Sequence, residues 1–191
     1  MENNLISILK NFVREKCVSE NSKYGEEVYE AHFVPMVEYA RELVRTHKEE
    51  EEKIDEEVVE ISSWLHDIGS IIYGRKDHHI TGAKIAEKKL RDLSYPEEKI
   101  KKVKKCILNH RGSRDNSRET KEEQIVAEAD AMSNFDNLPG IFKASLVHEK
   151  KTQEESRKEV IKKLQNKYNQ LSEKGKKLIK PRYDAAMLLL K

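Results

Sequence analysis

The chain has 191 residues, a length typical of a single domain. Its 37 Lys and Arg residues nearly balance its 35 Asp and Glu residues, and the net charge of +2 gives no strong signal for nucleic-acid binding. No apolar run reaches the roughly 18 residues that a membrane span needs, and residues 1–10 lack the basic and apolar regions of a secretion signal, so we expect a cytoplasmic protein with no membrane partner.

Helical patterns recur along the chain, and no alternating strand pattern of useful length interrupts them. Apolar residues at three- and four-residue spacing predict a first helix over residues 4–18. Pro35 falls where a second helix can begin, and Asp55 suits the N-cap of a third. Gly69 is expected to end that third helix or to lie just past its end.

Further helices are predicted in the second half of the chain. Residues 80–90 have a helical pattern, and Ser94–Glu97 and Thr120–Glu123 each have the pattern of a capping box that opens a helix. A long charged helix from about 152 to 171 either covers the core or builds a dimer interface, and the sequence leaves both open. We therefore predict an all-α fold, a single domain of about seven to nine helices.

The adjacent pair His66-Asp67 is the most informative feature of the sequence. Neighbouring residues on a helix point about 100° apart, so the two side chains do not both face the core as packing residues. At the end of the third predicted helix they can instead converge on one ion. Imidazole nitrogen together with carboxylate oxygen suits Mn, Fe, Co, Ni or Zn better than Ca or Mg.

Other candidate metal ligands lie on both sides of this pair. His32 lies near the start of one predicted helix, and Asp130 lies within another, among alanine and methionine residues. A carboxylate in such an apolar setting is costly to bury unless it meets a cation or hydrogen-bond donors. Ligands from several helices are what a metal site inside a helical bundle needs.

The order His32, His66-Asp67, Asp130 resembles that of the HD superfamily of metal-dependent phosphohydrolases. The local contexts are similar to two motifs of that family, its apolar-His-Asp-Ile-Gly signature at 63–69 and its later Ala-Asp segment at 129–133. The resemblance covers roughly residues 31–135. It implies a single HD-type helical domain with its core at about 24–137, and with the helix at 4–18 and C-terminal helices at 138–190 packed on that core.

The resemblance also implies a second metal, because some members of the superfamily add two histidines between the HD pair and the last Asp. The segment 78–83 is similar to their His-x-x-x-Gly-Ala motif and favours His78, with His79 as its competitor. His110 matches the second additional histidine. The implied site holds one or two divalent transition-metal ions per chain, and its six implied ligands are His32, His66, Asp67, His78, His110 and Asp130.

In this interpretation Asp67 bridges the two metals. His32, His66 and Asp130 hold one ion, and His78 and His110 hold the other. Asp67 is also the implied catalytic residue, because it can orient or deprotonate the attacking water.

One departure from the family pattern concerns phosphate binding. Ser70 stands where several phosphohydrolases of this family have a lysine after the Asp-Ile-Gly motif. Other cations must then neutralise the phosphate, and arginine suits its bidentate geometry. The candidates lie in or beside the loops after the HD pair and after His110: Arg75, Lys76, Arg111, Arg114 and Arg118.

The resemblance implies a hydrolase that cleaves a nucleotide or another small phosphate ester with metal-activated water. It does not separate a phosphomonoesterase from a pyrophosphohydrolase or a phosphodiesterase. Two other hypotheses stay open, a non-catalytic nucleotide-binding signalling module and a di-iron oxygenase, because some HD proteins with this ligand pattern use two irons and O₂. The sequence also leaves a homodimer open.

Overall fold

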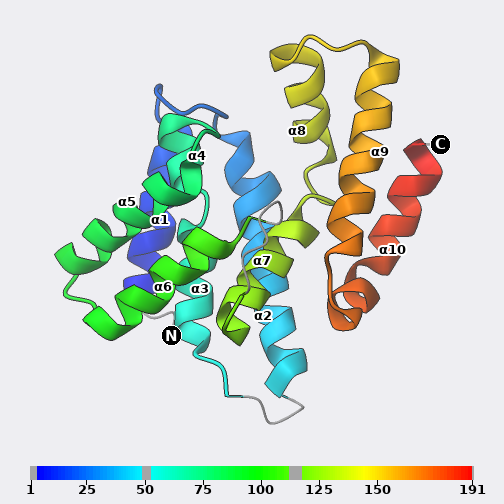
Figure 1. Cartoon of the computed structure of the whole chain (residues 1–191). Coiled ribbons are helices and arrows are strands. Elements are labelled where there is room, and N and C mark those ends of the chain that lie inside the picture. Colours follow the sequence, from blue (N-terminus) through cyan, green and yellow to red (C-terminus); the bar gives the residue numbers. More distant parts are fainter. Residues whose placement is uncertain (1–3, 49–52, 112–117, 191) are drawn as a thin grey trace.

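The computed structural model describes residues 4–48, 53–111 and 118–190, and these segments consist of helices and their connections, without a strand (Figure 1). The all-α prediction is therefore confirmed for the described chain. Among its helices, none combines the length and the apolar character that crossing a bilayer requires.

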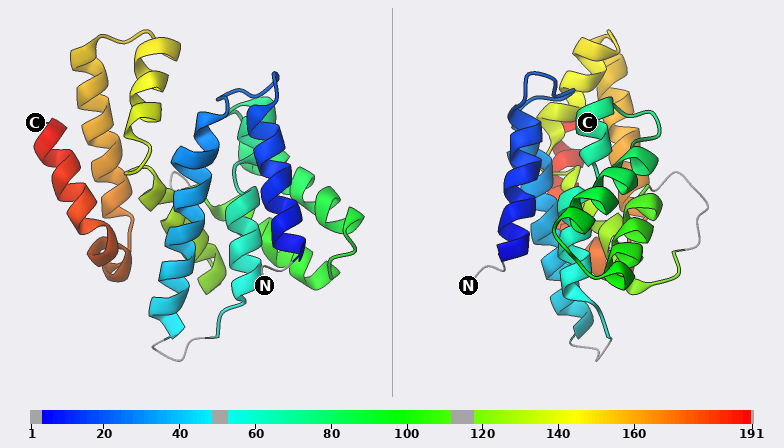
Figure 2. Two further views of the ribbon diagram at one scale, coloured as in Figure 1. Left: turned by 180° about the vertical axis from the view of Figure 1, so that it is seen from behind. Right: turned by 90° about the vertical axis from the view of Figure 1, so that its left-hand side faces the viewer.

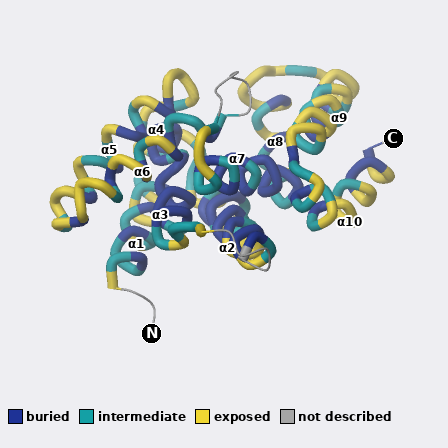
Figure 3. Tube along the Cα trace, turned by 60° about the horizontal axis from the view of Figure 1, so that its bottom comes forward, coloured by how far each residue is buried: buried dark blue, intermediate teal, exposed yellow. Residues whose placement is uncertain are grey.

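The helices up to Ser133 form a bundle around the HD pair. In chain order they are α1 (Asn4–Val18), the π-helical segment η1 (Tyr29–Phe33), α2 (Val34–Lys48), α3 (Glu56–Leu65), α4 (Ile68–Tyr73), α5 (His78–Asp92), α6 (Glu97–Asn109) and α7 (Lys121–Ser133). Helix α3 packs against α1, α2, α6 and α7, and α5 packs against α4 and α6. The largest fully buried apolar side chains belong to these helices, among them Leu9, Phe33, Leu43, Ile61 and Ile107. Figure 3 shows buried stretches of the trace, in dark blue, around α2, α3 and α7.

The remaining helices lie together on one side of this bundle (Figures 1 and 2). They are α8 (Leu138–Lys143), the π-helical segment η2 (Ala144–His148), α9 (Gln153–Asn169) and α10 (Glu173–Leu190). Helix α9 packs against α7, α8 and α10, and α10 also reaches α2. The long charged helix predicted at about 152–171 is thus α9, and it covers the bundle.

Three helix starts have a side-chain cap, and one predicted capping box does not form. The side chains of Asp55, Thr120 and Thr152 each accept a hydrogen bond from a backbone N–H of the first turn that they precede. The box predicted at Ser94–Glu97 does not form, because Ser94 adopts a left-handed backbone with φ of 55° and Pro96 occupies the N-cap of α6.

The position of Gly69 also differs from the prediction. It lies inside the short helix α4 rather than at the end of α3, so the chain between the two helices is only His66 and Asp67. A Cβ at Gly69 would overlap the backbone oxygen of His78 and lie 2.5 Å from the backbone nitrogen of Gly82. The absence of a side chain therefore lets α4 lie directly against α5, and this contact sets His78 beside the HD pair.

Candidate metal centre

Six helical elements bring the predicted ligands to one place. His66 and Asp67 occupy the junction of α3 and α4, and His78 is the first residue of α5. His32 lies in η1, where the wider π-helical turn differs from the α-helix that follows it. Single π-helical turns are often found at functional sites. His110 follows α6 directly, and Asp130 lies in α7.

Each of the four histidine ligands turns its Nδ1 toward an acceptor in the protein and its Nε2 toward the site. Three of them donate to the carbonyl oxygen three residues earlier, namely His66 to Ser63 (2.9 Å), His78 to Arg75 (2.8 Å) and His110 to Ile107 (2.6 Å). The Ser133 hydroxyl donates to the Asp130 carbonyl and so accepts from His32 Nδ1, at 2.9 Å. With the proton on Nδ1, each neutral ring presents the lone pair of Nε2 to the site.

These Nε2 atoms face one another in two pairs. The distance between the His32 and His66 Nε2 atoms is 3.0 Å, and that between the His78 and His110 Nε2 atoms is 3.3 Å. Two lone pairs at this separation repel each other unless a cation or a proton lies between them. The donor set therefore fits a metal ion at each pair.

Asp67 lies between the two pairs, with one oxygen toward each. Its Oδ2 is 3.7 Å from His32 Nε2 and 3.9 Å from His66 Nε2. Its Oδ1 is 3.2 Å from His78 Nε2 and 3.7 Å from His110 Nε2, and it has no hydrogen-bond partner among the described residues although it is buried. Two groups of ligand atoms consequently share Asp67, one with His32 and His66, the other with His78 and His110.

Asp130 completes the first group. Its Oδ1 is 3.7 Å from His32 Nε2 and 3.8 Å from His66 Nε2, and its Oδ2 accepts a 2.9 Å hydrogen bond from Lys167 Nζ of α9. Burial opposes ionisation of Asp130, but the ammonium of Lys167 is the largest opposing influence, and the pKa of Asp130 is held well below the ordinary value. The residue is thus an anion in the folded protein.

The electrostatics of the two groups differ at their histidines. In the first group, burial is the largest cause that lowers the pKa of His66 to about 3, and it keeps that ring neutral. Burial also disfavours the charged form of His110, but the adjacent Asp67 carboxylate outweighs this and raises the pKa of His110 above its ordinary value. The site attracts a cation next to Asp67, and a divalent ion would supply that charge.

The structure distinguishes between the two candidate ligands His78 and His79. His79 is buried in α5, with its ring 5.8 Å from that of His78, and it belongs to neither group of ligand atoms among the described residues. The motif-based choice of His78 agrees with this placement.

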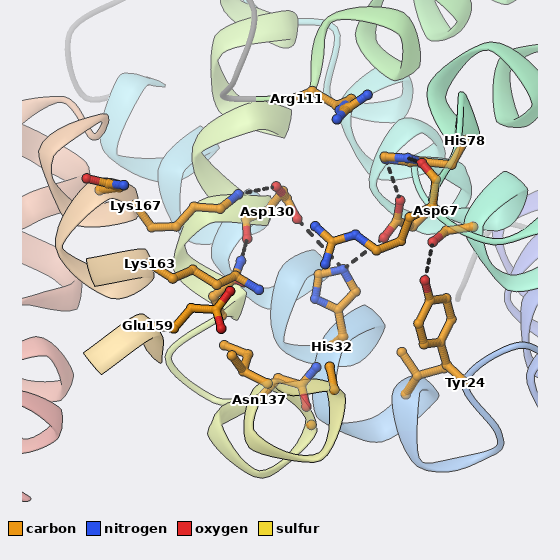
Figure 4. A pocket seen from close by; sticks show the side chains of 18 of the residues that line it. Tyr24, His32, Asp67, His78, Arg111, Asp130, Asn137, Glu159, Lys163 and Lys167 are labelled. Atoms are coloured by element: carbon orange, nitrogen blue, oxygen red, sulfur yellow. Dashed lines mark hydrogen bonds and ion pairs between the residues drawn. The ribbon is translucent and has the colours of Figure 1, made fainter. Parts of the chain in front are cut away.

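A cavity of about 900 Å³ opens over the ligands, between the bundle and α9 (Figure 4). Of the predicted phosphate-binding residues, Arg75 and Arg111 line it. Lys76 is exposed and is not among the residues that line the cavity, so nothing in this arrangement supports its predicted role. Arg114 lies outside the described residues. Arg118 donates to the carbonyl oxygens of Asn109 and Arg111, and it therefore shapes the chain after α6.

Several cations of the cavity were not predicted from the sequence. Helix α9 contributes all four lysines that line the cavity among the described residues: Lys158, Lys162, Lys163 and Lys167. Their pairs at i and i+4, 158/162 and 163/167, were the available signal, because residues four apart share a face of a helix. In a helix with so many charges, this spacing did not distinguish a cavity wall from a solvated surface.

The HD domain family matches residues 29–134, more than half of the chain, and the chain belongs to this family. The HD pair and the other predicted ligands all fall within the matched segment. No curated protein and no solved structure gave a significant match. The HD domain is a domain of the metal-dependent phosphohydrolase type, and the donor set described above fits divalent metals.

Proposed function

We propose that this protein is a metal-dependent phosphohydrolase that cleaves a nucleotide or another small phosphate ester. The observation that carries the proposal is the position of Asp67, whose two oxygens face two separate pairs of histidine Nε2 atoms. Such an arrangement suits two ions held a short distance apart, as in enzymes that clamp a phosphate between two metals.

Each predicted ligand has a place in this proposal. His32, His66 and Asp130 would hold one ion, His78 and His110 would hold the other, and Asp67 would touch both. Bound divalent ions would supply Lewis acidity and would lower the pKa of water toward neutrality. Asp67 would orient the attacking water and accept its proton, because it is the carboxylate between the two groups.

Binding of the phosphate would fall to Arg75 and Arg111. Both line the cavity, and among the described residues their guanidinium groups have no acidic partner. They would replace the charge that the family lysine supplies where this chain has Ser70, whose hydroxyl here lies 3.5 Å from the Tyr24 hydroxyl. A cavity of about 900 Å³ is at the upper end of the range for small-ligand sites and has room for a nucleotide.

The test combines metal content with activity. Wild type and Asp67→Asn are loaded with Mn, Co, Ni or Zn and measured by elemental analysis, and both are assayed against phosphomonoesters, pyrophosphates and phosphodiesters. We expect about two ions per wild-type chain, loss of both in Asp67→Asn, and hydrolysis of one substrate class by wild type alone. Asp92→Asn is the matched control, since it removes an exposed carboxylate at the end of α5.

Two outcomes would overturn the proposal in favour of the open alternatives. Tight nucleotide binding without turnover by any metal form would favour a signalling module. Bound iron together with O₂ consumption on addition of a substrate would favour a di-iron oxygenase.

A further inference from the structure

Helix α9 leads away from the metal centre along the wall of the cavity. Its Lys167 contacts the candidate ligand Asp130, and Lys163 lies one turn farther, about 6 Å along the helix axis. Lys158 lies about 13 Å from Lys167 along the same axis. Figure 4 shows Lys163 and Lys167 reaching from α9 toward the centre, on the side of the cavity opposite His78. The cavity therefore has cations both at the centre and at a distance from it.

The four lysines differ in whether an acidic group already neutralises them. Lys167 pairs with Asp130, and Lys158 pairs with Glu154 at 3.2 Å. In the described chain, Lys162 and Lys163 make no hydrogen bond and no ion pair. These two positive charges are available to a ligand.

Glu159, an acidic side chain of α9, makes no hydrogen bond or ion pair with either of these two lysines, although its charge acts on Lys163 through space. Glu159 also lines the cavity, but its carboxylate accepts hydrogen bonds from Lys151 and from the Ser145 hydroxyl. Its hydrogen bonds are thus made with η2 and with the residue before α9, and Lys162 and Lys163 are left without a contacting carboxylate among the described residues.

Lys163 also lies close to cations from both sides. Its side chain is partly withdrawn from water, and this burial lowers its pKa to about 8, helped by repulsion from Arg75 and Lys167, which the carboxylates of Asp130 and Asp67 oppose without reversing the shift. Arg75 belongs to the bundle and Lys163 to α9, so like charges from two parts of the fold face one cavity. Such repulsion destabilises the protein alone and is relieved when an anion enters.

We propose that Lys162 and Lys163 form a second anion-binding subsite, so that the preferred substrate carries a second anionic group in addition to the phosphate at the metals. This rests on the proposed phosphohydrolase function, because it takes the metal centre as the place of the scissile phosphate. The substrate class is a small phosphate ester with a further phosphate or carboxylate, one to two helical turns away from the reacting phosphorus.

The test uses phosphonates, whose carbon–phosphorus bond resists hydrolysis, as probes in calorimetric titrations of the Mn-loaded protein. Propylphosphonate has one anionic group, propane-1,3-bisphosphonate has two, and 3-phosphonopropanoate carries a carboxylate as its second. We expect the bisphosphonate to bind at least about tenfold more tightly than propylphosphonate, as for a charge-assisted contact. The carboxylate probe shows which second anion the subsite prefers.

The double variant Lys162→Gln/Lys163→Gln should abolish this tenfold advantage and leave propylphosphonate binding and Mn content unchanged. Lys88→Gln/Lys177→Gln is the matched control, because it removes the same charge from exposed positions of α5 and α10 that do not line the cavity. Equal affinity of wild type for the one- and two-anion probes would overturn the inference alone. Absence of Mn binding, or of binding by all three phosphonates, would count against the proposed function itself.

Discussion

Lys167 Nζ donates a 2.9 Å hydrogen bond to Asp130 Oδ2, and the other oxygen of that carboxylate faces His32 and His66. The two residues are 37 positions apart, on α9 and α7. The C-terminal helices are thereby tied to the metal centre through one ion pair between partly buried groups. Lys167 both neutralises Asp130 and fixes which oxygen points inward.

Replacing Lys167 by Met should therefore affect the metal-free protein more than the metal-loaded protein. Without its cation, Asp130 is left as an unpaired buried carboxylate, which should cost about 3–5 kcal/mol of unfolding free energy. A bound divalent ion would offset most of this loss. Urea unfolding with and without EDTA measures both values. Lys180→Met is the control, since it removes a lysine from an exposed pair with Asp184. Equal destabilisation in both states would contradict this role.

The Ser133 hydroxyl should influence metal affinity without touching the metal. It accepts from His32 Nδ1 and so holds that ring with Nε2 toward the site. Loss of such a supporting partner typically weakens metal binding by about 10–100-fold. We expect that loss in Ser133→Ala, measured by competition with a chromogenic chelator. In the control Ser63→Ala the affinity should stay within about twofold, because Ser63 holds His66 through its backbone carbonyl.

Much of the site could be predicted because its signals are local in the sequence. The HD pair, His110 and Asp130 each lie in a short recognisable context, and spacing within a motif favoured His78 over His79. The structure brings these side chains together with His32 as the motif order implied. Helix starts at Asp55 and Thr120 were predictable for the same reason, since a cap acts on the next turn of the chain.

The features that sequence reasoning missed depend on distant contacts. Nothing near Lys163 or Lys167 in the sequence indicates that α9 packs over a site built by other helices. The sequence pattern predicts Gly69 at the end of a helix or just past it, yet its role is to allow the close approach of the α5 backbone, which only the packed structure shows. The box at Ser94 failed because the chain there turns through a left-handed conformation before α6.

The pH dependence of stability should reveal the buried neutral histidines once metal is removed. Burial lowers the pKa of His66 to about 3 and also lowers that of His32, whereas both titrate near 6.5 in the unfolded chain. Below pH 6.5 the unfolded chain therefore binds more protons than the folded protein, so the unfolding free energy falls as pH decreases. The slope reaches about 1.4 kcal/mol per pH unit for each such histidine.

His110 contributes in the opposite direction and in another window. Its pKa is raised in the folded protein, so its stabilising contribution is present below pH 6.5 and is lost as pH rises through the folded value. Urea unfolding of EDTA-treated protein between pH 7 and pH 4 should show the fall in unfolding free energy that is caused by His66 and His32. The slope should be reduced in His66→Gln and unchanged in the exposed-site control His148→Gln. A flat profile over this range in wild type would contradict neutral burial.

Gly69 and Gly82 offer a matched pair for the contact between α4 and α5. A Cβ at Gly69 would run into the backbone of α5, whereas a Cβ at Gly82 would have its nearest neighbours at 3.4 Å, the Gly69 nitrogen and the His66 oxygen. We expect Gly69→Ala to lower the unfolding free energy by about 3 kcal/mol or more, as overpacking against the backbone does. Gly82→Ala should change it by less than about 1 kcal/mol, since its smaller overlap is offset by better helix propensity.

The same pair tests whether this contact positions His78. Because a shift of α5 would move His78 away from Asp67, Gly69→Ala should also reduce the bound metal by one ion per chain under conditions in which it is still folded. The ion held by His32, His66 and Asp130 should be retained, because its ligands lie outside α5. Elemental analysis of the folded variant at low temperature measures this. Full retention of both ions in Gly69→Ala would show that α5 reaches the site without the close contact at Gly69.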